Sequence, residues 1–461
     1  MSAQSLQCVV GIDLGSTTTK AVMLDLDSKV IGRGITNSRS NYEVACAVAR
    51  IEAVTNARFN LLERAMVERG GEKARADVSA LREAFKLELF LGDLEDLRET
   101  ILAQVAASTR ADKDKLRGAV TEVLERVRKA APGLFLDGAP RKSDFFRDLA
   151  GAAFVAEAEA LAKDFGVGFE ALVALYDRAI LDVETRLRPR DTRGLLRTSL
   201  ERLEQRGGTW DKAKSTLAVA AIDAATAVVL DELVVVGTGY GRQTLPFPKE
   251  SVRSEILCHG RGAHRTFPGT RTVLDIGGQD TKAIQVDELG VVTSFQMNDR
   301  CAAGCGRYLG YIADELNLGL HELGPLALEA EKTIKVNSTC TVFAGAELRE
   351  RLGLGQRRED ILAGLHRAIM LRAMSLLARS GGIKSEFTFT GGVCNNAAAT
   401  KVLRELVDEN YGKEIVLNMS PDSIYMGALG AALFGLDDVK AGITPELPAF
   451  VRAHAMEATA S

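Results

Sequence analysis

Two stretches of the chain each place an acidic residue, a glycine-containing turn, hydroxyl side chains and a lysine between apolar runs. One is GIDLGSTTTKAVMLD at 11–25, and the other is LDIGGQDTKAIQVD at 274–287. Glycine lets the backbone approach an anion, and exposed amides and hydroxyls then bind phosphate oxygens. The aspartate at the strand end can hold Mg²⁺ or orient a water molecule. Two such loops facing each other would enclose a triphosphate and suit phosphoryl transfer.

A third glycine pair stands in TGGVCNN at 390–396, where a predicted strand ends and a helix begins. Small residues at that point would admit a ribose or an adenine ring. The sequence contains neither GxxxxGK[ST] nor GxGxxG, so a P-loop and a Rossmann site have no support. Either acidic loop alone would be read as an ordinary β-hairpin, but the two matched loops and this third element together favour a nucleotide site.

Two of the seven cysteines, Cys301 and Cys340, directly precede predicted helices. A thiolate at a helix N-terminus is stabilised by the helix dipole and by free amides, which lower its pKa. The same environment suits an iron–sulfur cluster, which takes four thiolate ligands. One chain with two well-placed cysteines favours a cluster shared between two chains of a dimer.

The other cysteines carry weaker signals. Cys258 lies beside His259 and would suit zinc, but no second pair at C-x-x-C spacing supports that reading. Cys305 lies four residues after Cys301 and is either an extra ligand or a thiol near the metal site. The remaining three are interpreted as small buried apolar residues, namely Cys8, Cys46 and Cys394.

Lys20 and Lys282 occupy equivalent places in the two matched stretches. Each would either reach a phosphate or lie at a solvated strand end, and the sequence leaves both readings open.

The loops need strands to position them. Residues 8–12, 20–26 and 29–35 read as three strands joined by short turns, which predicts an antiparallel meander. A second run of short strands covers 272–295, and further strands are expected at 233–237 and 386–392. The repeated pattern predicts an α/β fold with two duplicated lobes.

The sequence between the two stretches has a pattern typical of helices. Leu116, Val120, Val123, Leu124 and Val127 recur at helical spacing, as expected for an amphipathic helix. We therefore expect an all-helical insertion in the first lobe. The expected parts are a first lobe at 1–42 and 213–268, an insertion at 43–212, a second lobe at 269–435 and a loose C-terminal tail at 436–461.

Composition limits the function classes. The 461 residues correspond to about three domains. The formal net charge of −4 argues against a broad nucleic-acid surface. The longest apolar stretch is too short to cross a membrane and no signal peptide is evident, so we expect a cytoplasmic protein with reduced cysteines and no membrane partner.

At this point the sequence resembles the BadF/BadG/BcrA/BcrD ATPase family. That family joins activators of 2-hydroxyacyl-CoA dehydratases with ATPase subunits of benzoyl-CoA reductase, within the actin, Hsp70 and sugar-kinase superfamily of ribonuclease H-like ATPases. The resemblance covers about 1–40 and 213–435. It is carried by GIDLGSTTTK, VVGTGYGR, SEILCHGRGAH, DIGGQDTK, MNDRCAAGCGRYL, STCTVFAGAE and GGVCNN.

The resemblance implies ATP with Mg²⁺ as ligand, with Asp13, Asp275 and Gln279 as catalytic residues. It implies a [4Fe-4S] cluster across a dimer interface, with Cys301 and Cys340 as ligands. The implied nucleotide-binding residues are Gly15, Ser16, Thr17, Thr18 and Lys20 in the first loop, Gly277 and Gly278 in the second, and Gly391 and Gly392 on the adenosine side.

By this resemblance the chain is an ATP-driven electron-transfer subunit, loaded by ferredoxin and working beside a sister ATPase subunit and acyl-CoA-reducing subunits. The compact activators lack a helical insertion, so the length favours a benzoyl-CoA reductase. The alternative is the activator of a 2-hydroxyacyl-CoA dehydratase. More distant alternatives are a sugar kinase and a chaperone-like ATPase of the same superfamily.

Overall fold

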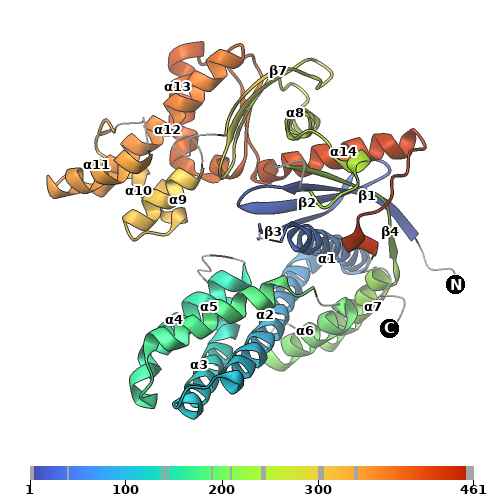
Figure 1. Cartoon of the computed structure of the whole chain (residues 1–461). Helices are drawn as coiled ribbons and strands as arrows, with labels where there is room; N and C mark the ends of the chain where they lie inside the picture. Colours follow the sequence, from blue (N-terminus) through green and yellow to red (C-terminus); the bar gives the residue numbers. More distant parts are fainter. Residues whose placement is uncertain are drawn as a thin grey trace. The chain divides into compact units, whose positions relative to one another are not determined.

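The computed structural model (Figure 1) describes residues 5–38, 41–136, 139, 143, 145–187, 191–207, 210–239, 245–299, 306–336 and 341–452, without the side chains of 341, 342 and 344. The chain forms two compact units. One consists of residues 7–53 and 232–452. The other consists of residues 1–6, 54–231 and 453–461. Each is described by itself.

The first sheet of the 7–53/232–452 unit has four strands in the order β3-β2-β1-β4. Strand β1 pairs antiparallel with β2, and β2 pairs antiparallel with β3, which confirms the predicted meander. Residues 8–14 of β1 are all buried, and because successive side chains point to opposite faces, both faces of the sheet are covered at this strand. The strands are β1 (Ser5–Leu14), β2 (Thr18–Asp25), β3 (Val30–Asn37) and β4 (Val229–Gly239).

The second sheet of this unit has five strands in the order β7-β6-β5-β8-β9. Its first three strands form an antiparallel meander, and β8 and β9 extend it in parallel beside β5. Both sheets thus begin with the same local motif. The strands are β5 (Thr272–Ile276), β6 (Thr281–Val286), β7 (Val292–Asn298), β8 (Phe387–Thr390) and β9 (Leu417–Asn418).

Helices cover the sheets of this unit. Helix α14 (Met426–Lys440) packs on the first sheet, and α8 (Glu255–Thr266) packs on one face of the second sheet. The other face of the second sheet carries the largest apolar core of the unit. Its helices are α9 (Gly306–Glu315), α10 (Leu323–Leu328), α11 (Thr341–Gly353), α12 (Arg358–Ser380) and α13 (Ala397–Tyr411).

Helices α8 and α14 pack closely because glycines line their contact. A β-carbon on Gly262 would lie 2.0 Å from the carbonyl oxygen of Met426, and one on Gly430 would lie 1.9 Å from that of Cys258. Only glycine permits such an approach. The helix on the first sheet is therefore joined directly to the helix on the second.

The described residues from 54 to the start of β4 are mainly helical, and they form two apolar clusters. Leu116, Val120, Val123, Leu124 and Val127 are all buried in one of them, which confirms the predicted amphipathic helix. Helix α1 (Tyr42–Gly70) enters this unit from the other. Its own helices are α2 (Ala74–Ala107), α3 (Lys113–Leu134), α4 (Phe146–Phe165), α5 (Phe169–Thr185), α6 (Thr192–Arg206) and α7 (Lys212–Ala227).

Two features of the C-terminal half differ from simple sequence readings. Residues 436–440, expected in a loose C-terminal tail, belong to α14, and the side chains of Phe450 and Val451 are buried. Among the described helices, α12 is long and apolar enough to span a membrane by length and composition. Two-thirds of its apolar window is buried inside the protein, as in the core helix of a folded domain.

Candidate nucleotide site

The two matched stretches form equivalent hairpins in the two sheets. Asp13 at the end of β1 lies opposite Lys20 of β2, and Asp275 near the end of β5 lies opposite Lys282 of β6. Each aspartate is thus seven residues before its cross-strand lysine, with the glycine-containing turn between them. The duplication predicted from the sequence therefore includes the pairing register of the two hairpins.

The turns of the two hairpins lie against each other. A β-carbon on Gly278 would lie 2.1 Å from Oγ1 of Thr17 and 3.4 Å from Oγ of Ser16. The backbone of the second loop therefore approaches the hydroxyl side chains of the first. Ser16 and Thr17 are exposed, so their hydroxyls are available to a ligand.

Alternation along the strands explains how the two aspartates meet. Asp13 shares a face of β1 with Val9, which packs under α14, and Asp275 shares a face of β5 with Val273, which packs under α8. Because α8 and α14 are in contact, both carboxylates point toward one centre. His259 of α8 lies there, with Nε2 3.8 Å from Oδ2 of Asp13 and Nδ1 3.3 Å from Oδ1 of Asp275.

A buried ion network holds the second aspartate. Lys282 is only 1% exposed, and its Nζ lies 3.2 Å from Asp275 and 2.9 Å from both Asp280 and Glu255. Asp275 also accepts a hydrogen bond of 2.9 Å from the hydroxyl of Thr390 on β8. The interpretation of Lys282 as a solvated strand end is therefore wrong, because its ammonium group is buried among three carboxylates.

Burial and charge together set the protonation of this centre. Burial alone would raise the pKa of Asp275, but His259 and Lys282 outweigh it and hold that pKa well below its usual value. Burial would likewise lower the pKa of Lys282, but its carboxylate partners hold it well above the usual value. Burial raises the pKa of Glu255, and the nearby ammonium of Lys282 opposes this only in part.

Asp13, the aspartate of the first loop, has fewer polar partners than Asp275. Oδ1 of Asp13 is buried and has no hydrogen-bond partner within the described residues. The Lys20 ammonium donates to the carbonyl of Thr18, and it lies 3.4 Å from the position of a β-carbon on Gly15. Lys20 therefore belongs to the loop itself, half-buried at the edge of the site.

The second loop is hydrogen-bonded to the start of α9. The amides of Gly306 and Arg307 donate to the carbonyls of Gly277 and Gly278 at 2.8 and 2.7 Å. Gln279 is half-buried beside this turn. The three cysteines expected near the metal site, Cys301, Cys305 and Cys340, lie outside the described residues.

A cavity of about 620 Å³ is lined by Cys394 and Asn395, which follow the glycine pair at the end of β8 in the sequence. Gly391 has a φ of +85° and its backbone abuts the carbonyl of Ile276, so it requires glycine. Gly392 has open space beside it. Asn395 and Thr400 line the cavity with the apolar side chain of Met419, a mixture that suits a nucleoside.

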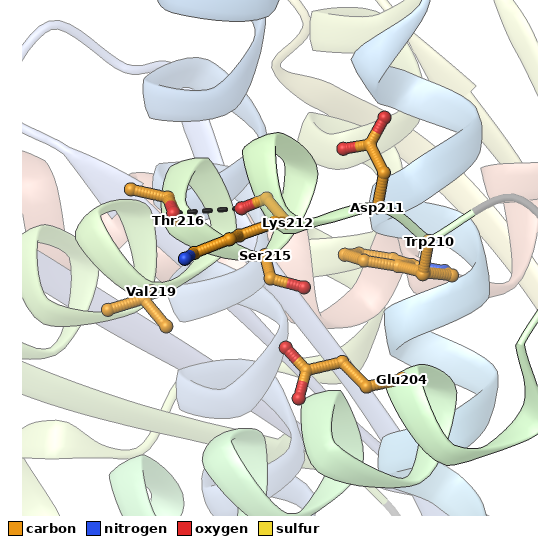
Figure 2. A pocket seen from close by; sticks show the side chains of 7 residues that line it. All are labelled: Glu204, Trp210, Asp211, Lys212, Ser215, Thr216 and Val219. Atoms are coloured by element: carbon orange, nitrogen blue, oxygen red, sulfur yellow. Dashed lines mark hydrogen bonds between the residues drawn. The ribbon is translucent and has the colours of Figure 1, made fainter.

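The helical unit has a hollow of its own, which the sequence did not indicate. It has a volume of about 440 Å³ and is lined by the single tryptophan, Trp210, with Glu204 and residues of α7 (Figure 2). Lys212 and Thr216 are joined there by a hydrogen bond from the Thr216 hydroxyl to the Lys212 carbonyl.

The donor set at the buried centre fits a divalent cation. Ligand atoms of Asp13, Glu255 and His259 lie within 4.8 Å of one another. When ionised, the four carboxylates of this centre outnumber the Lys282 ammonium and a protonated imidazole by two charges. Mg²⁺ is bound through one or two carboxylates together with phosphate oxygens, so the unpaired oxygen of Asp13 is a suitable ligand.

Glu255 and His259 are functional candidates that sequence reasoning did not select. They are four residues apart in SEILCHGRGAH, a spacing that places both on one face of a helix. That four-residue spacing is the feature of the sequence from which the two candidates could have been found.

The chain is similar in sequence to known ATPases. A model of the BadF/BadG/BcrA/BcrD ATPase family matches residues 10–435. The (R)-2-hydroxyglutaryl-CoA dehydratase activating ATPase of Acidaminococcus fermentans is 42% identical over 204 residues, 44% of this chain and 75% of that protein. A subunit of the benzoyl-CoA reductase of Thauera aromatica is 36% identical over 180 residues, 39% of this chain and 64% of that protein.

Among solved structures, component A of the Acidaminococcus fermentans dehydratase aligns with 94% of this chain and 99% of its own chain. The TM-score is 0.52 at 22% identity, a likeness that identifies the fold. The expected α/β fold with duplicated actin-like lobes is thereby confirmed.

Proposed function

Because this chain belongs to the BadF/BadG/BcrA/BcrD ATPase family, we propose that it is the ATP-hydrolysing electron-transfer activator of a 2-hydroxyacyl-CoA dehydratase. The observation that carries the nucleotide part is the approach of Gly278 to Thr17, which brings the two phosphate loops together. The proposal has three parts: ATP hydrolysis, a cluster and a partner.

For ATP hydrolysis, the loop amides and the hydroxyls of Ser16 and Thr17 bind phosphate oxygens. Bound Mg²⁺ would neutralise phosphate charge, and Asp13 is the residue best placed to hold it. Asp275 is fixed by Thr390 and Lys282 and orients the attacking water, together with Gln279. The cavity lined by Asn395 and Thr400 receives the nucleoside.

For electron transfer, Cys301 and Cys340 bind a [4Fe-4S] cluster shared with a second chain. Support comes from the hydrogen bonds that Gly306 and Arg307 donate to the second phosphate loop. Gly306 is five residues after Cys301, so these hydrogen bonds join the second loop to a segment that is close in sequence to the cysteine. The nucleotide state can thereby bias the arrangement of the cluster-binding segment.

The choice of partner differs from the expectation based on length. The insertion favoured a benzoyl-CoA reductase, but the dehydratase activating ATPase is more similar, at 42% against 36% identity, and more of it is matched. That match covers 44% of this chain. The reductase protein remains the second candidate because it is also a relative. In both cases ferredoxin is the proposed donor, and a second copy or a sister subunit completes the dimer.

The first test is anaerobic purification of the full chain, alone and with co-purifying subunits, followed by assays of ATP hydrolysis, iron and acid-labile sulfide. We expect ATP turnover together with iron and sulfide. Protein that hydrolyses ATP but holds neither iron nor sulfide would overturn the electron-transfer part alone. Protein that does not hydrolyse ATP would overturn the ATPase part.

The second test separates the partners. The reduced protein and ATP are mixed with the catalytic subunits of a 2-hydroxyacyl-CoA dehydratase or of a benzoyl-CoA reductase, and product is measured. Activation of the dehydratase is expected. Activation of the reductase alone would assign the chain to the second candidate. Cys301→Ala should lose the cluster and keep ATP binding, whereas Cys46→Ala, at a buried helical cysteine, should keep both.

A further inference from the structure

His259 has an unusual position for a buried histidine. Its side chain is 7% exposed, and its two ring nitrogens face carboxylates from the two different sheets, Asp13 and Asp275. Nδ1 has no hydrogen-bond partner of good geometry within the described part of the chain, nor has Oδ1 of Asp13. The ring therefore lies between two carboxylates without being fixed to the backbone of its own helix.

A second buried histidine shows the ordinary structural arrangement. His366 on α12 is 1% exposed, and its Nδ1 lies 2.7 Å from the carbonyl oxygen of Leu362, one turn earlier in the same helix. Within the described residues, Nε2 of His366, like Nδ1 of His259, has no hydrogen-bond partner, but His366 forms no ion pair with a carboxylate. His259 thus differs from a histidine that merely completes a core.

The packing around His259 leaves room for this arrangement. A β-carbon on Gly427, at the start of α14, would lie 2.7 Å from Oδ2 of Asp13 and 2.8 Å from Nε2 of His259. The helix of the first sheet therefore covers the gap between the aspartate and the imidazole, and only glycine fits there. Three elements, β1, α8 and α14, meet at this contact.

We propose that His259 is a positioning residue for ATP hydrolysis, which sets the spacing between Asp13 of the first lobe and Asp275 of the second. The inference rests on the proposed ATPase function and goes beyond it. Asp275 is already held by Lys282 and Thr390, so the imidazole transmits that fixed position to Asp13. Asp13 has no other partner of this kind within the described residues.

The two contacts of the ring can be removed one at a time. The amide nitrogen of asparagine occupies the place of Nδ1, so His259→Asn keeps the contact with Asp275 and loses the one with Asp13. The amide nitrogen of glutamine occupies the place of Nε2, so His259→Gln does the reverse. Residues that support metal-binding ligands typically contribute about 10- to 100-fold to activity.

The experiment measures kcat and KM for ATP, and the Mg²⁺ concentration needed for half-maximal turnover, in the full chain. The variants are His259→Asn and His259→Gln, with His264→Gln on the same helix as the matched control. His264 lies outside the centre, with its ring beside the carbonyl of Glu288. Circular dichroism and thermal unfolding check that each variant is folded.

We expect both His259 variants to lose kcat by about tenfold or more with KM for ATP changed little. His259→Asn should also need more Mg²⁺, because it loses the contact with Asp13. The control should match the wild type. Folded His259 variants with wild-type kcat and Mg²⁺ dependence would overturn the inference and leave the ATPase proposal intact. Failure of the wild type to hydrolyse ATP would instead refute the proposed function.

Discussion

Gly278 of the second hairpin lies directly against Thr17 of the first, so close that an added β-carbon would be 2.1 Å from the threonine hydroxyl. The two residues are 261 positions apart in the chain. Their contact joins the two halves of the duplicated motif into one site. Residues at this contact should therefore affect catalysis more than folding.

Gly278→Ala tests that contact. The new methyl group must displace the Thr17 side chain, so we expect ATP turnover to fall by about tenfold or more, since small misplacements of reacting groups are costly. The free energy of unfolding should change by less than about 1 kcal/mol, because Thr17 is exposed and can move. Steady-state kinetics and urea unfolding measure the two effects. Gly92→Ala is the control, since nothing lies within 4 Å of a β-carbon on Gly92.

Asp13→Asn keeps the shape of the side chain and removes its charge. We expect ATP turnover to fall by about 100-fold, because the residue proposed to hold the cation would be neutral. Iron and sulfide content should stay at the wild-type level. Asp27→Asn, at an exposed turn, provides the comparison. Normal ATP turnover in Asp13→Asn would show that the first loop has been misassigned.

Lys282 and Lys20 should differ sharply in their effect on stability, although they occupy equivalent strand positions. Lys282→Met leaves three carboxylates in a buried site without their cation, which should cost about 3–5 kcal/mol of unfolding free energy. Lys20→Met loses a single bond to a loop carbonyl and should cost about 1 kcal/mol. Chemical denaturation of both variants gives the comparison. Equal losses would contradict the buried network.

His366 gives a pH dependence with a defined sign. Burial lowers the pKa of His366, although its bond to the Leu362 carbonyl opposes the shift. Because the folded pKa lies below the unfolded value of about 6.5, the stability from this group is present above pH 6.5 and is lost as the pH falls through the folded pKa. One group changes the unfolding free energy by at most about 1.4 kcal/mol per pH unit.

The measurement compares urea unfolding of the wild type and His366→Asn at several pH values from 8 to 5. The wild type should lose more stability toward low pH than the variant does. Parallel pH curves for the two proteins would show that His366 does not titrate in this way. His259 has the opposite direction, because the charge of Asp275 outweighs burial and raises its pKa.

Much of the site was available from local sequence. The hairpins that carry Asp13 and Asp275 follow from alternating apolar residues and turn glycines, which act over a few neighbouring positions. The same holds for the third glycine pair and for the helical character of the insertion. Such features depend on short-range sterics and hydrogen bonding, so a single sequence predicts them.

The tertiary structure decided how the separate pieces meet. The sequence placed Lys282 at the end of a strand, but only packing showed that Glu255, Asp275 and Asp280 surround its ammonium group. The sequence showed His259 only as a neighbour of Cys258. In the folded chain, the glycine contacts of α8 with α14 bring the His259 ring between two aspartates. These relationships join residues as many as 262 positions apart, and burial sets their charges. No local pattern encodes such distances, because they arise only when two sheets and two helices pack around one centre.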